Sequence, residues 1–262
     1  MSLLHTPDDA DLERRFGGLR RLYGAVAYER LRTLRLAVIG VGGVGSWAAE
    51  ALARSGVATL VLIDMDHVAE SNINRQIQAL TGTVGQAKIE ALRDRIAQIH
   101  PGCEVVLVDD FVDEDNVASL LDQGPLDGVI DCCDQVRAKA ALAAWGIAHG
   151  VPVVTVGAAG GKLLPHAIEV ADLADVTHDP LLSSLRQRLR QRHGGARKGR
   201  MGLTCVFSRE AVRPPQDGAC STDGSLNCHG YGSSVTVTAS FGMNAAAVLL
   251  NQVLAKAGKV GI

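Results

Sequence analysis

A glycine-rich turn at residues 40–45, G-V-G-G-V-G, has the residue types and the spacing of a phosphate-binding loop. Its positions without a side chain, where backbone can approach a phosphate closely, are Gly40, Gly42, Gly43 and Gly45. Small and apolar residues recur at helical spacing over 43–54, which places the glycines at the N-terminus of a helix. The free N–H groups and the positive dipole end of such a helix attract anions, so the turn predicts an anion site.

Two apolar runs, 36–39 and 60–63, stand on either side of this helix and predict buried parallel strands. Asp64 follows the second run, where an acidic side chain can accept hydrogen bonds from ribose hydroxyls. A glycine turn alone is weak evidence, because such turns also occur where a helix packs tightly on a strand. Here strand, turn, helix and acid come in the order that a nucleotide site requires, so we predict a nucleotide site.

A dense polar cluster comes next, in the sequence D-M-D-H-V-A-E-S-N-I-N-R-Q that begins at Asp64. Its acceptors, amides and single planar cation suit a nucleotide whose sugar and polyphosphate both need partners, whereas an NAD-dependent dehydrogenase has no need of them. The alternative is a polar loop with an Asx turn. The side chains concerned are Asp66, Ser71, Asn72, Asn74, Arg75 and Gln76. Lys88, near the start of a helix expected over 84–99, is either a phosphate contact or an ordinary exposed charge.

Two aspartates, Asp131 and Asp134, follow a strand expected over 128–131. They stand at the carboxyl end of this strand, the rim at which open parallel sheets bind ligands. Mg²⁺ prefers carboxylate and phosphate oxygens and keeps several waters, so one aspartate facing a triphosphate is sufficient to hold it. Asp134 could also cap a helix expected over 136–149, and the two roles can coexist.

The elements that would position these residues alternate as strand and helix, which predicts an α/β fold. We expect a Rossmann-like, doubly wound, mainly parallel sheet with a C-terminal extension of strands and helices. Further strands are expected at 104–108 and 151–156, and the sheet is expected to be complete with the latter, whose GAAGGK turn lines the same rim. An arginine-rich stretch, 9–32, is expected to form two short helices broken at Gly17 and Gly18.

The extension after Lys162 departs from the strand–helix rhythm and carries a basic segment. A helix is expected over 179–192, followed by a glycine-bearing loop. Seven of the 26 Lys and Arg residues, and none of the 28 Asp and Glu residues, lie in 186–200: Arg186, Arg188, Arg190, Arg192, Arg197, Lys198 and Arg200. The remaining chain is therefore acidic, and a nucleic acid would meet this local basic feature. A solvated charged face is the alternative.

Composition predicts a globular protein of a reducing compartment. The chain has 262 residues, 47% of them hydrophobic, which is enough for a sizeable core. Its N-terminus lacks the apolar core of a signal peptide, so we expect a cytoplasmic protein. Its 6 cysteines include no C-x-x-C pair, which predicts free thiols and no structural zinc. Cys228, next to His229, is either a nucleophile or a bystander thiol.

A charge-free stretch near the C-terminus, 235–255, is long enough to span a bilayer. Its Thr, Ser, Asn and Gln residues make it a poor lipid-facing helix, so we expect a buried or dimer-interface helix and no membrane association.

The motifs together resemble those of the ubiquitin-activating-enzyme superfamily, whose bacterial members adenylate carboxylates. The resemblance spans about residues 15–160 and is carried by Gly40–Gly45, D-M-D at 64–66, S-N-I-N-R-Q at 71–76, Lys88 and D-C-C-D at 131–134. It implies ATP contacts at Gly43, Asp64, Asn72, Arg75, Gln76 and Lys88. It also implies Asp134 as the aspartate that meets magnesium and phosphate, with Arg75, Lys88 and Asp134 acting in catalysis.

Further segments resemble the tRNA threonylcarbamoyladenosine dehydratases over nearly the whole chain. They include R-F-G-G-L-R-R-L-Y-G at 15–24, V-D-D-F-V at 108–112, A-A-G-G-K at 158–162 and C-V-F-S-R-E-A at 205–211. In this family ATP activates the threonyl carboxylate of the modified adenosine at tRNA position 37, next to the anticodon, and an internal nucleophile closes a ring with loss of water. The resemblance implies ATP and Mg²⁺, a homodimer, and a possible cysteine-desulfurase partner system.

On this interpretation residues 1–262 form a single adenylating domain with three parts. These are a helical arm at 9–32, a nucleotide-binding core at 34–160, and a tRNA-side and dimer extension at 161–262. The superfamily motif R-Y-x-R has a second arginine where this chain has Gly18. Any one of Arg15, Arg20 and Arg21 could therefore be the arginine that reaches a phosphate. The alternative function is adenylation of the C-terminal Gly-Gly of a sulfur-carrier protein. The absence of zinc-binding C-x-x-C pairs and the presence of the basic segment argue against that branch.

Overall fold

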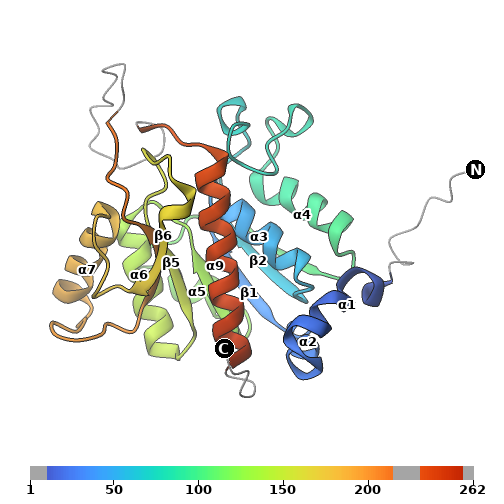
Figure 1. Ribbon diagram of the computed structural model, residues 1–262, viewed down its shortest axis with the longest axis horizontal. Helices are drawn as coiled ribbons and strands as arrows, with labels where there is room; N and C mark the ends of the chain where they lie inside the picture. Colours follow the sequence, from blue (N-terminus) through green and yellow to red (C-terminus); the bar gives the residue numbers. More distant parts are fainter. Residues whose placement is uncertain (1–10, 215–230, 256–262) are drawn as a thin grey trace, which may run out of the picture.

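The computed structural model describes residues 11–214 and 231–255 and is an α/β structure around one seven-stranded sheet (Figure 1). The strand order is β3-β2-β1-β4-β5-β7-β6. Neighbouring strands are parallel except β6, which pairs antiparallel with β7 at the sheet edge. The strands are β1 Arg35–Ile39, β2 Thr59–Ile63, β3 Glu104–Val108, β4 Gly128–Asp131, β5 Val153–Val156, β6 Ile168–Asp172 and β7 Thr204–Ser208. The predicted α/β, mainly parallel fold is therefore confirmed.

Helices cover both faces of the sheet, because the central strands are apolar on both sides. Leu36 and Val38 of β1 belong to one hydrophobic cluster, and Ala37 and Ile39 belong to the other. The first face is covered by α3 Gly45–Arg54, α4 Lys88–Ile99 and α9 Val235–Ala255, and the second by α6 Val136–His149 and α7 Pro180–Arg192 with the short α5 Val117–Leu121. Short 3₁₀ turns are η2 Glu70–Asn72, η3 Thr81–Thr83 and η4 Pro165–Ala167.

The strand order creates the crevice in which a ligand can bind. The chain runs outward from β1 through β2 to β3, then returns to place β4 on the other side of β1. At this switch point the loops after β1 and β4 leave toward opposite faces of the sheet, and the space between them opens at the carboxyl ends of the strands. The glycine turn, Asp64 and Asp134 all follow strands that end at this edge.

The expectation that the sheet ends with β5 is wrong. β7 pairs parallel with β5, with Thr155 opposite Cys205, and β6 then closes the edge. Val206 and Phe207 of β7 are fully buried, so the extension contributes to the same core as the nucleotide-binding part. The alternation of parallel strands and helices is broken here because β6 and β7 are antiparallel. The helix α7 lies between these two strands in the sequence.

The expected break at Gly17 and Gly18 is also wrong. One helix, α1 Leu12–Tyr23, runs through both glycines, and the break falls at Gly24, which has φ +83° and precedes α2 Ala25–Leu31. A left-handed φ suits glycine, whereas glycines inside a helix weaken it without ending it. Buried Phe16 anchors the helix on the domain, where its ring meets His100 edge-on. Two further helices begin later than expected, α3 at Gly45 and α4 at Lys88.

The charge-free helix α9 lies across one face of the sheet and packs against α3 (Figure 1). Among the described residues it is the one helix long and apolar enough to cross a membrane, but Phe241, Ala245 and Leu249 are fully buried in the core. Gly242 allows the closest approach, because a Cβ there would meet Val44 O at 2.4 Å and the Trp47 Cβ at 2.8 Å. The expectation of a buried helix is confirmed.

The α9–α3 contact predicts opposite effects for two glycine substitutions in helices. Gly242→Ala should lower the free energy of unfolding by about 1–3 kcal/mol, because the added methyl must push apart two helix backbones. Gly18→Ala, at an exposed position of α1 where a Cβ would have only the Arg21 Nη2 at 3.8 Å, should raise it by up to about 1 kcal/mol through helix propensity alone. Urea unfolding followed by circular dichroism measures both changes. Equal effects of the two substitutions would contradict the close approach of α9.

Candidate functional site

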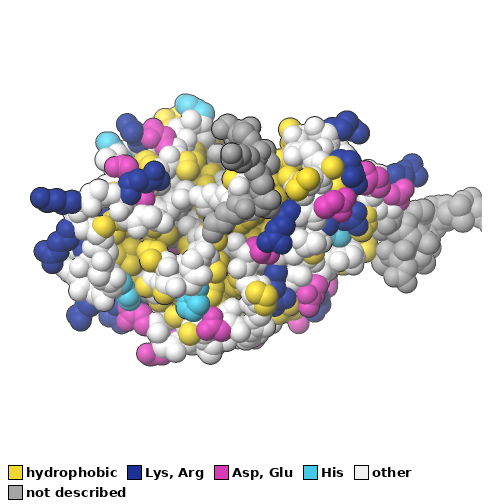
Figure 2. Space-filling view, turned by 90° about the horizontal axis from the view of Figure 1, so that it is seen from below, with side chains coloured by type: hydrophobic (Ala, Val, Ile, Leu, Met, Phe, Trp, Pro, Cys, Tyr) yellow, Lys and Arg dark blue, Asp and Glu magenta, His cyan; other side chains and the backbone are white. Residues whose placement is uncertain are grey.

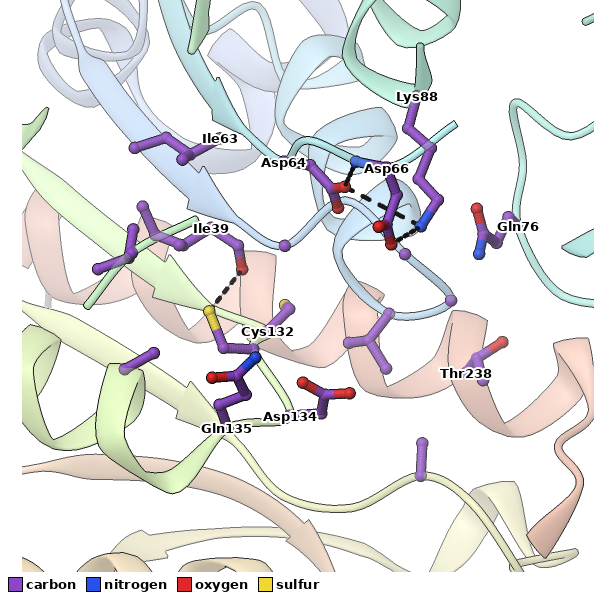
Figure 3. Close-up of a pocket in the computed structure, with 18 of the residues that line it drawn as sticks. Ile39, Ile63, Asp64, Asp66, Gln76, Lys88, Cys132, Asp134, Gln135 and Thr238 are labelled. Atoms are coloured by element: carbon purple, nitrogen blue, oxygen red, sulfur yellow. Dashed lines mark hydrogen bonds and ion pairs between the residues drawn. The ribbon is translucent and has the colours of Figure 1, made fainter. Parts of the chain in front are cut away.

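A single pocket at the carboxyl edge of the sheet collects most of the predicted site residues (Figure 3). It lies between the glycine turn after β1, the ends of β2 and β4, and the first turn of α9. Of the predicted nucleotide-site residues, those that line it are Gly40, Gly42, Gly43, Asp64, Asp66, Arg75, Gln76, Lys88 and Asp134. Residues from separate strands therefore meet in one cavity, as expected for a switch-point site.

The glycine turn is closed so tightly that side chains are excluded at two of its positions. Gly40 has φ +79°, and a Cβ there would meet Cys132 O at 3.1 Å. At Gly45 a Cβ would lie 1.9 Å from Gly40 O. Gly42 is different, because its nearest neighbour would be the Gln76 Nε2 at 3.9 Å. Gly40 and Gly45 thus shape the turn, whereas the missing side chain at Gly42 leaves space in the pocket itself.

Asp64, Asp66 and Lys88 form a charged group on the wall of the pocket that follows β2 (Figure 3). Lys88 Nζ lies 2.6 Å from Asp66 Oδ2 and 4.0 Å from Asp64 Oδ1. Asp64 accepts hydrogen bonds from Val41 N at 2.8 Å and from Asp66 N at 2.9 Å. Burial raises the pKa of Asp64, although Lys88 and these hydrogen bonds oppose the rise. Lys88 is buried together with Asp64, although Asp66 is exposed, so the alternative of an ordinary exposed charge is wrong.

Arg75 reaches the pocket from the loop after η2 and is itself buried. Its Nη1 donates to Ser71 O at 2.6 Å and to Asn74 Oδ1 at 2.9 Å. Gln76, beside it, lines the pocket and accepts a hydrogen bond from Gln78 Nε2 at 3.2 Å. The polar loop therefore supplies one fixed cation and one amide to the cavity.

The structure separates the two aspartates after β4. Asp131 is fully buried, pairs with Lys139 Nζ at 3.2 Å and accepts a hydrogen bond from Thr155 Oγ1. Burial opposes the charge on Lys139, but the Asp131 carboxylate outweighs it, so the pKa of Lys139 is raised. Asp134 is exposed in the pocket and has no hydrogen bond or ion pair with any residue in 11–214 or 231–255.

Asp134 does not cap the following helix. The N-cap residue of α6 is Gln135, and no side chain of the described residues makes a capping hydrogen bond there. The suggestion that Asp134 serves as an N-cap is therefore wrong, and its carboxylate remains available to a ligand.

Two residues predicted to bind the nucleotide do not line the pocket, Gly45 and Asn72. Gly45 is packed against the Gly40 carbonyl, as the turn requires. Asn72 is buried, and its Oδ1 accepts a hydrogen bond from Ala69 N at 3.0 Å. Both residues shape the loops around the site. The Asn72 side chain bonds to the N–H three residues before it, so it does not form an Asx turn, which bonds two residues ahead.

The N-terminal arginines also lie outside the pocket lining. Arg15 Nη1 donates to Ile99 O at 2.6 Å and so caps the end of α4. Arg20 pairs with Glu13 and Glu29, at 3.3 Å and 3.1 Å, and lies over the ring of Tyr28. Arg21 has no such contact with a described residue.

Several lining residues were not predicted as site residues. Thr238 enters from α9, Leu181 from α7, and Asp110, Phe111 and Val112 from the loop after β3. The last three could have been found, because they directly follow a strand that ends at the ligand edge. Nothing in the local sequence points to Thr238, since it lies 163 positions after Arg75 and is one of several uncharged polar residues in its helix.

The thiols at the pocket are poor nucleophiles. Burial raises the pKa of Cys132 to about 12 and also holds the pKa of Cys133 well above its ordinary value. A thiol in this state is protonated near neutral pH and unreactive. Cys228, the cysteine weighed as a nucleophile, lies outside the described residues.

The basic segment 186–200 occupies the end of α7 and the loop after it, away from the pocket. Dark-blue side chains project from the left end of Figure 2, the end at which α7 lies in Figure 1. Arg186 donates to Leu173 O and Val176 O, at 3.0 Å and 2.8 Å, and Arg188 pairs with Glu114 at 2.6 Å. Arg192, Arg197 and Lys198 are exposed and have no ion pair or hydrogen bond with a described residue. The seven cations are therefore not equivalent.

The geometry suits a ligand with several negative charges. Lys88 lies across the pocket from the Asp134 carboxylate (Figure 3). Arg75 and the N-terminus of α3 supply further positive charge to the lining. The described residues contain no group of three or more His, Cys, Asp or Glu side chains that could hold a metal by themselves. A lone aspartate fits Mg²⁺ only when ligand oxygens and water complete its octahedral shell.

Comparison with known proteins matches residues 17–256 to the ThiF family. The tRNA threonylcarbamoyladenosine dehydratase of Escherichia coli (strain K12) is 46% identical over 259 residues, which cover 95% of this chain and 96% of that protein. The protein of the same name from Haemophilus influenzae is 42% identical over 248 residues, covering 93% of this chain and 95% of that one.

The fold is likewise shared. The crystal structure of the E. coli tRNA N6-threonylcarbamoyladenosine dehydratase in complex with ATP matches with a TM-score of 0.87 at 45% identity, covering 96% of this chain and 99% of that one. The resemblance to an adenylating superfamily is thereby confirmed over the whole fold. The chain belongs to the ThiF family and groups within it with the tRNA threonylcarbamoyladenosine dehydratases.

Proposed function

We propose that this chain uses ATP to dehydrate threonylcarbamoyladenosine at position 37 of tRNA, next to the anticodon, to its cyclic form. The observation that carries the proposal is the meeting of Arg75, Lys88 and Asp134 with the glycine turn in one pocket. A crystal structure of the similar E. coli dehydratase contains ATP, which supports ATP as the nucleotide. The threonyl carboxylate attacks the α-phosphate, forming a mixed anhydride and releasing pyrophosphate. An internal nucleophile of the same modified base then closes the ring and releases AMP.

The first step must bring two anions together, and the pocket residues offset their charge. The N–H groups at the glycine turn and the Arg75 guanidinium would bind phosphate oxygens, while Lys88 would exchange part of its pairing with Asp66 for the polyphosphate. Asp64 would accept hydrogen bonds from the ribose hydroxyls. Asp134 would hold Mg²⁺, which would supply positive charge to offset that of the phosphates. The second step needs no protein nucleophile, because proximity within the substrate makes ring closure fast.

We also propose that the chain is a single adenylating domain that works as a cytoplasmic homodimer. The arm 9–32, core 34–160 and extension 161–262 would keep the roles assigned above, with tRNA and the dimer partner on the extension. Apolar side chains on the outer side of α9, Val235 at 38% and Met243 at 39% exposure, support a partner surface there. Arg21 is then the best placed of the three N-terminal arginines to reach a partner's phosphates, because Arg15 and Arg20 are engaged. A cysteine-desulfurase system remains a proposed partner by family resemblance alone.

The competing function is adenylation of a sulfur-carrier protein with a C-terminal Gly-Gly. The basic end of α7 favours a nucleic acid over such a small protein partner.

Incubation of the protein with ATP, Mg²⁺ and tRNA that bears threonylcarbamoyladenosine tests the proposed function. We expect mass spectrometry of the digested nucleosides to show loss of one water from the modified adenosine and formation of AMP. Unchanged nucleoside with wild-type protein would reject the dehydratase. Release of pyrophosphate only when a Gly-Gly carrier protein is added would instead establish the competing function.

Arg75→Ala and Asp134→Ala are each expected to reduce AMP formation by at least about 10²-fold, because each removes a charge that acts on the developing phosphoryl charge. Circular dichroism should show an intact fold, since Asp134 has no partner in 11–214 or 231–255. Lys139→Met is the contrasting variant. It leaves buried Asp131 without its ion pair and should lower stability by about 3–5 kcal/mol. Near-normal turnover of either alanine variant would refute the site assignment.

The basic segment gives a separate prediction for tRNA binding. The triple variant Arg192→Gln, Arg197→Gln and Lys198→Gln should weaken tRNA binding and reduce the slope of log K against log salt by about 1 for each phosphate that is no longer neutralised. The matched control, Arg14→Gln, Arg93→Gln and Arg209→Gln, removes the same charge from exposed positions elsewhere. Filter binding at several salt concentrations measures both. Equal slopes for the two triple variants would mean that net charge, and not this segment, attracts the tRNA.

A further inference from the structure

The backbone carbonyl of Arg75 accepts two hydrogen bonds from outside its own loop. Trp47 Nε1, in α3, lies 2.9 Å from Arg75 O, and Thr238 Oγ1, in α9, lies 3.3 Å from it. Thr238 also has the usual local acceptor, the carbonyl of Val235, but at 3.5 Å. Thr238 is fully buried, so its hydroxyl needs a partner, and the closer one is the Arg75 carbonyl.

The Arg75 guanidinium is held in a similar way at one of its ends. Nη1 donates to Ser71 O and to Asn74 Oδ1, and the Asn74 amide in turn donates from Nδ2 to Ser233 O at 2.9 Å. Nε and Nη2 make no hydrogen bond to a residue in 11–214 or 231–255, and the side chain lines the pocket. One nitrogen therefore fixes the orientation of the guanidinium, and two nitrogens with three N–H donors remain for a ligand.

Thr238 joins these contacts to the glycine turn. Its Cγ2 lies 3.3 Å from the position that a Cβ on Gly43 would occupy, and the aliphatic part of Arg75 lies at 3.4 Å from the same point. The hydroxyl thus contacts the backbone of the cationic residue, while the methyl group packs beside the turn.

We propose that Trp47 and Thr238 are positioning residues for Arg75, and that α9 thereby takes part in the reaction. The inference rests on the proposed function, in which Arg75 offsets charge on the phosphates. A guanidinium helps most when it is held where charge develops in the transition state, and small displacements at such a site cost large factors in rate. α3 and α9 are rigid helices packed together at Gly242, so they can hold the Arg75 carbonyl at a fixed place.

Thr238→Val and Trp47→Phe test the proposal, because each removes one donor. Thr238→Val keeps the side-chain shape, and Trp47→Phe keeps an aromatic ring in place of the indole. We expect each variant to lower kcat for AMP formation about tenfold, with a change in KM for ATP of less than about threefold. Thr238→Ser keeps the hydroxyl and loses the methyl group, and it should retain most of the wild-type kcat. Thr236→Val is the matched control, since Thr236 is exposed and bonds only within its own turn.

The outcomes separate this inference from the proposed function. No AMP formation by the wild-type protein would reject the function itself. An active wild type with unchanged kcat in both Thr238→Val and Trp47→Phe would overturn the positioning role, as would a rise in KM alone. A loss in Thr238→Ser as large as in Thr238→Val would also overturn it, because packing and not the hydrogen bond would then matter. If Thr238→Val does not fold, Trp47→Phe and Thr238→Ser still decide between these outcomes.

Discussion

The backbone contact between α3 and α9 is the constraint on which the site depends. Gly242 allows α9 to lie directly on the first turn of α3, the turn that follows the glycine loop. Thr238 stands four residues earlier on the same face of α9, so the approach at Gly242 carries Thr238 to the pocket. Trp47 of α3 reaches the same Arg75 carbonyl. A helix near the C-terminus thus completes a pocket whose other walls come from segments between residues 39 and 181.

The charges around the pocket fall into two classes that follow from burial. Asp131 and Lys139 are both fully buried and satisfy each other, so they support the turn after β4 and have no capacity left for a ligand. Lys88 is paired mainly with Asp66, whose carboxylate is largely exposed, so that pairing can be exchanged at modest cost. Asp134 has no such partner within the described ranges. Whether a charged group can bind a ligand therefore depends on whether it is already paired in the interior, and not on its residue type.

The same distinction applies to the basic end of α7. Arg186 donates hydrogen bonds to two backbone carbonyls of the loop before α7, and Arg188 forms an ion pair with Glu114. These two arginines therefore fix α7 to the segments around it. The exposed cations after them include Arg192, the last residue of the helix, and Arg197 and Lys198 in the loop that follows. The helix α7 begins beside the pocket, at Asp179 and Pro180. It has 13 residues and is roughly 20 Å long, so its basic end lies several nucleotide lengths from its start. A substrate that enters the pocket and also reaches the basic end must therefore be large.

The sequence by itself determined the nucleotide-binding half, because its signals are local. A short apolar strand, a glycine turn and an amphipathic helix each specify their own backbone, and β1, α3 and β2 lie within two residues of the predicted bounds. Asp64 and Asp134 could be placed at the ligand edge because the carboxyl ends of parallel strands meet there.

Only the tertiary structure decided what depends on contacts between distant segments. Whether Asp131 or Asp134 is available depends on Lys139 and Thr155, which are polar residues without a distinctive pattern. The place of β7 in the sheet depends on pairing with β5, about fifty residues earlier, and the break after α1 depends on which glycine adopts a positive φ. Thr238 is the clearest case, since its role arises from the packing of α9 on α3, and side-chain periodicity shows which face of a helix is buried but not which neighbour covers it.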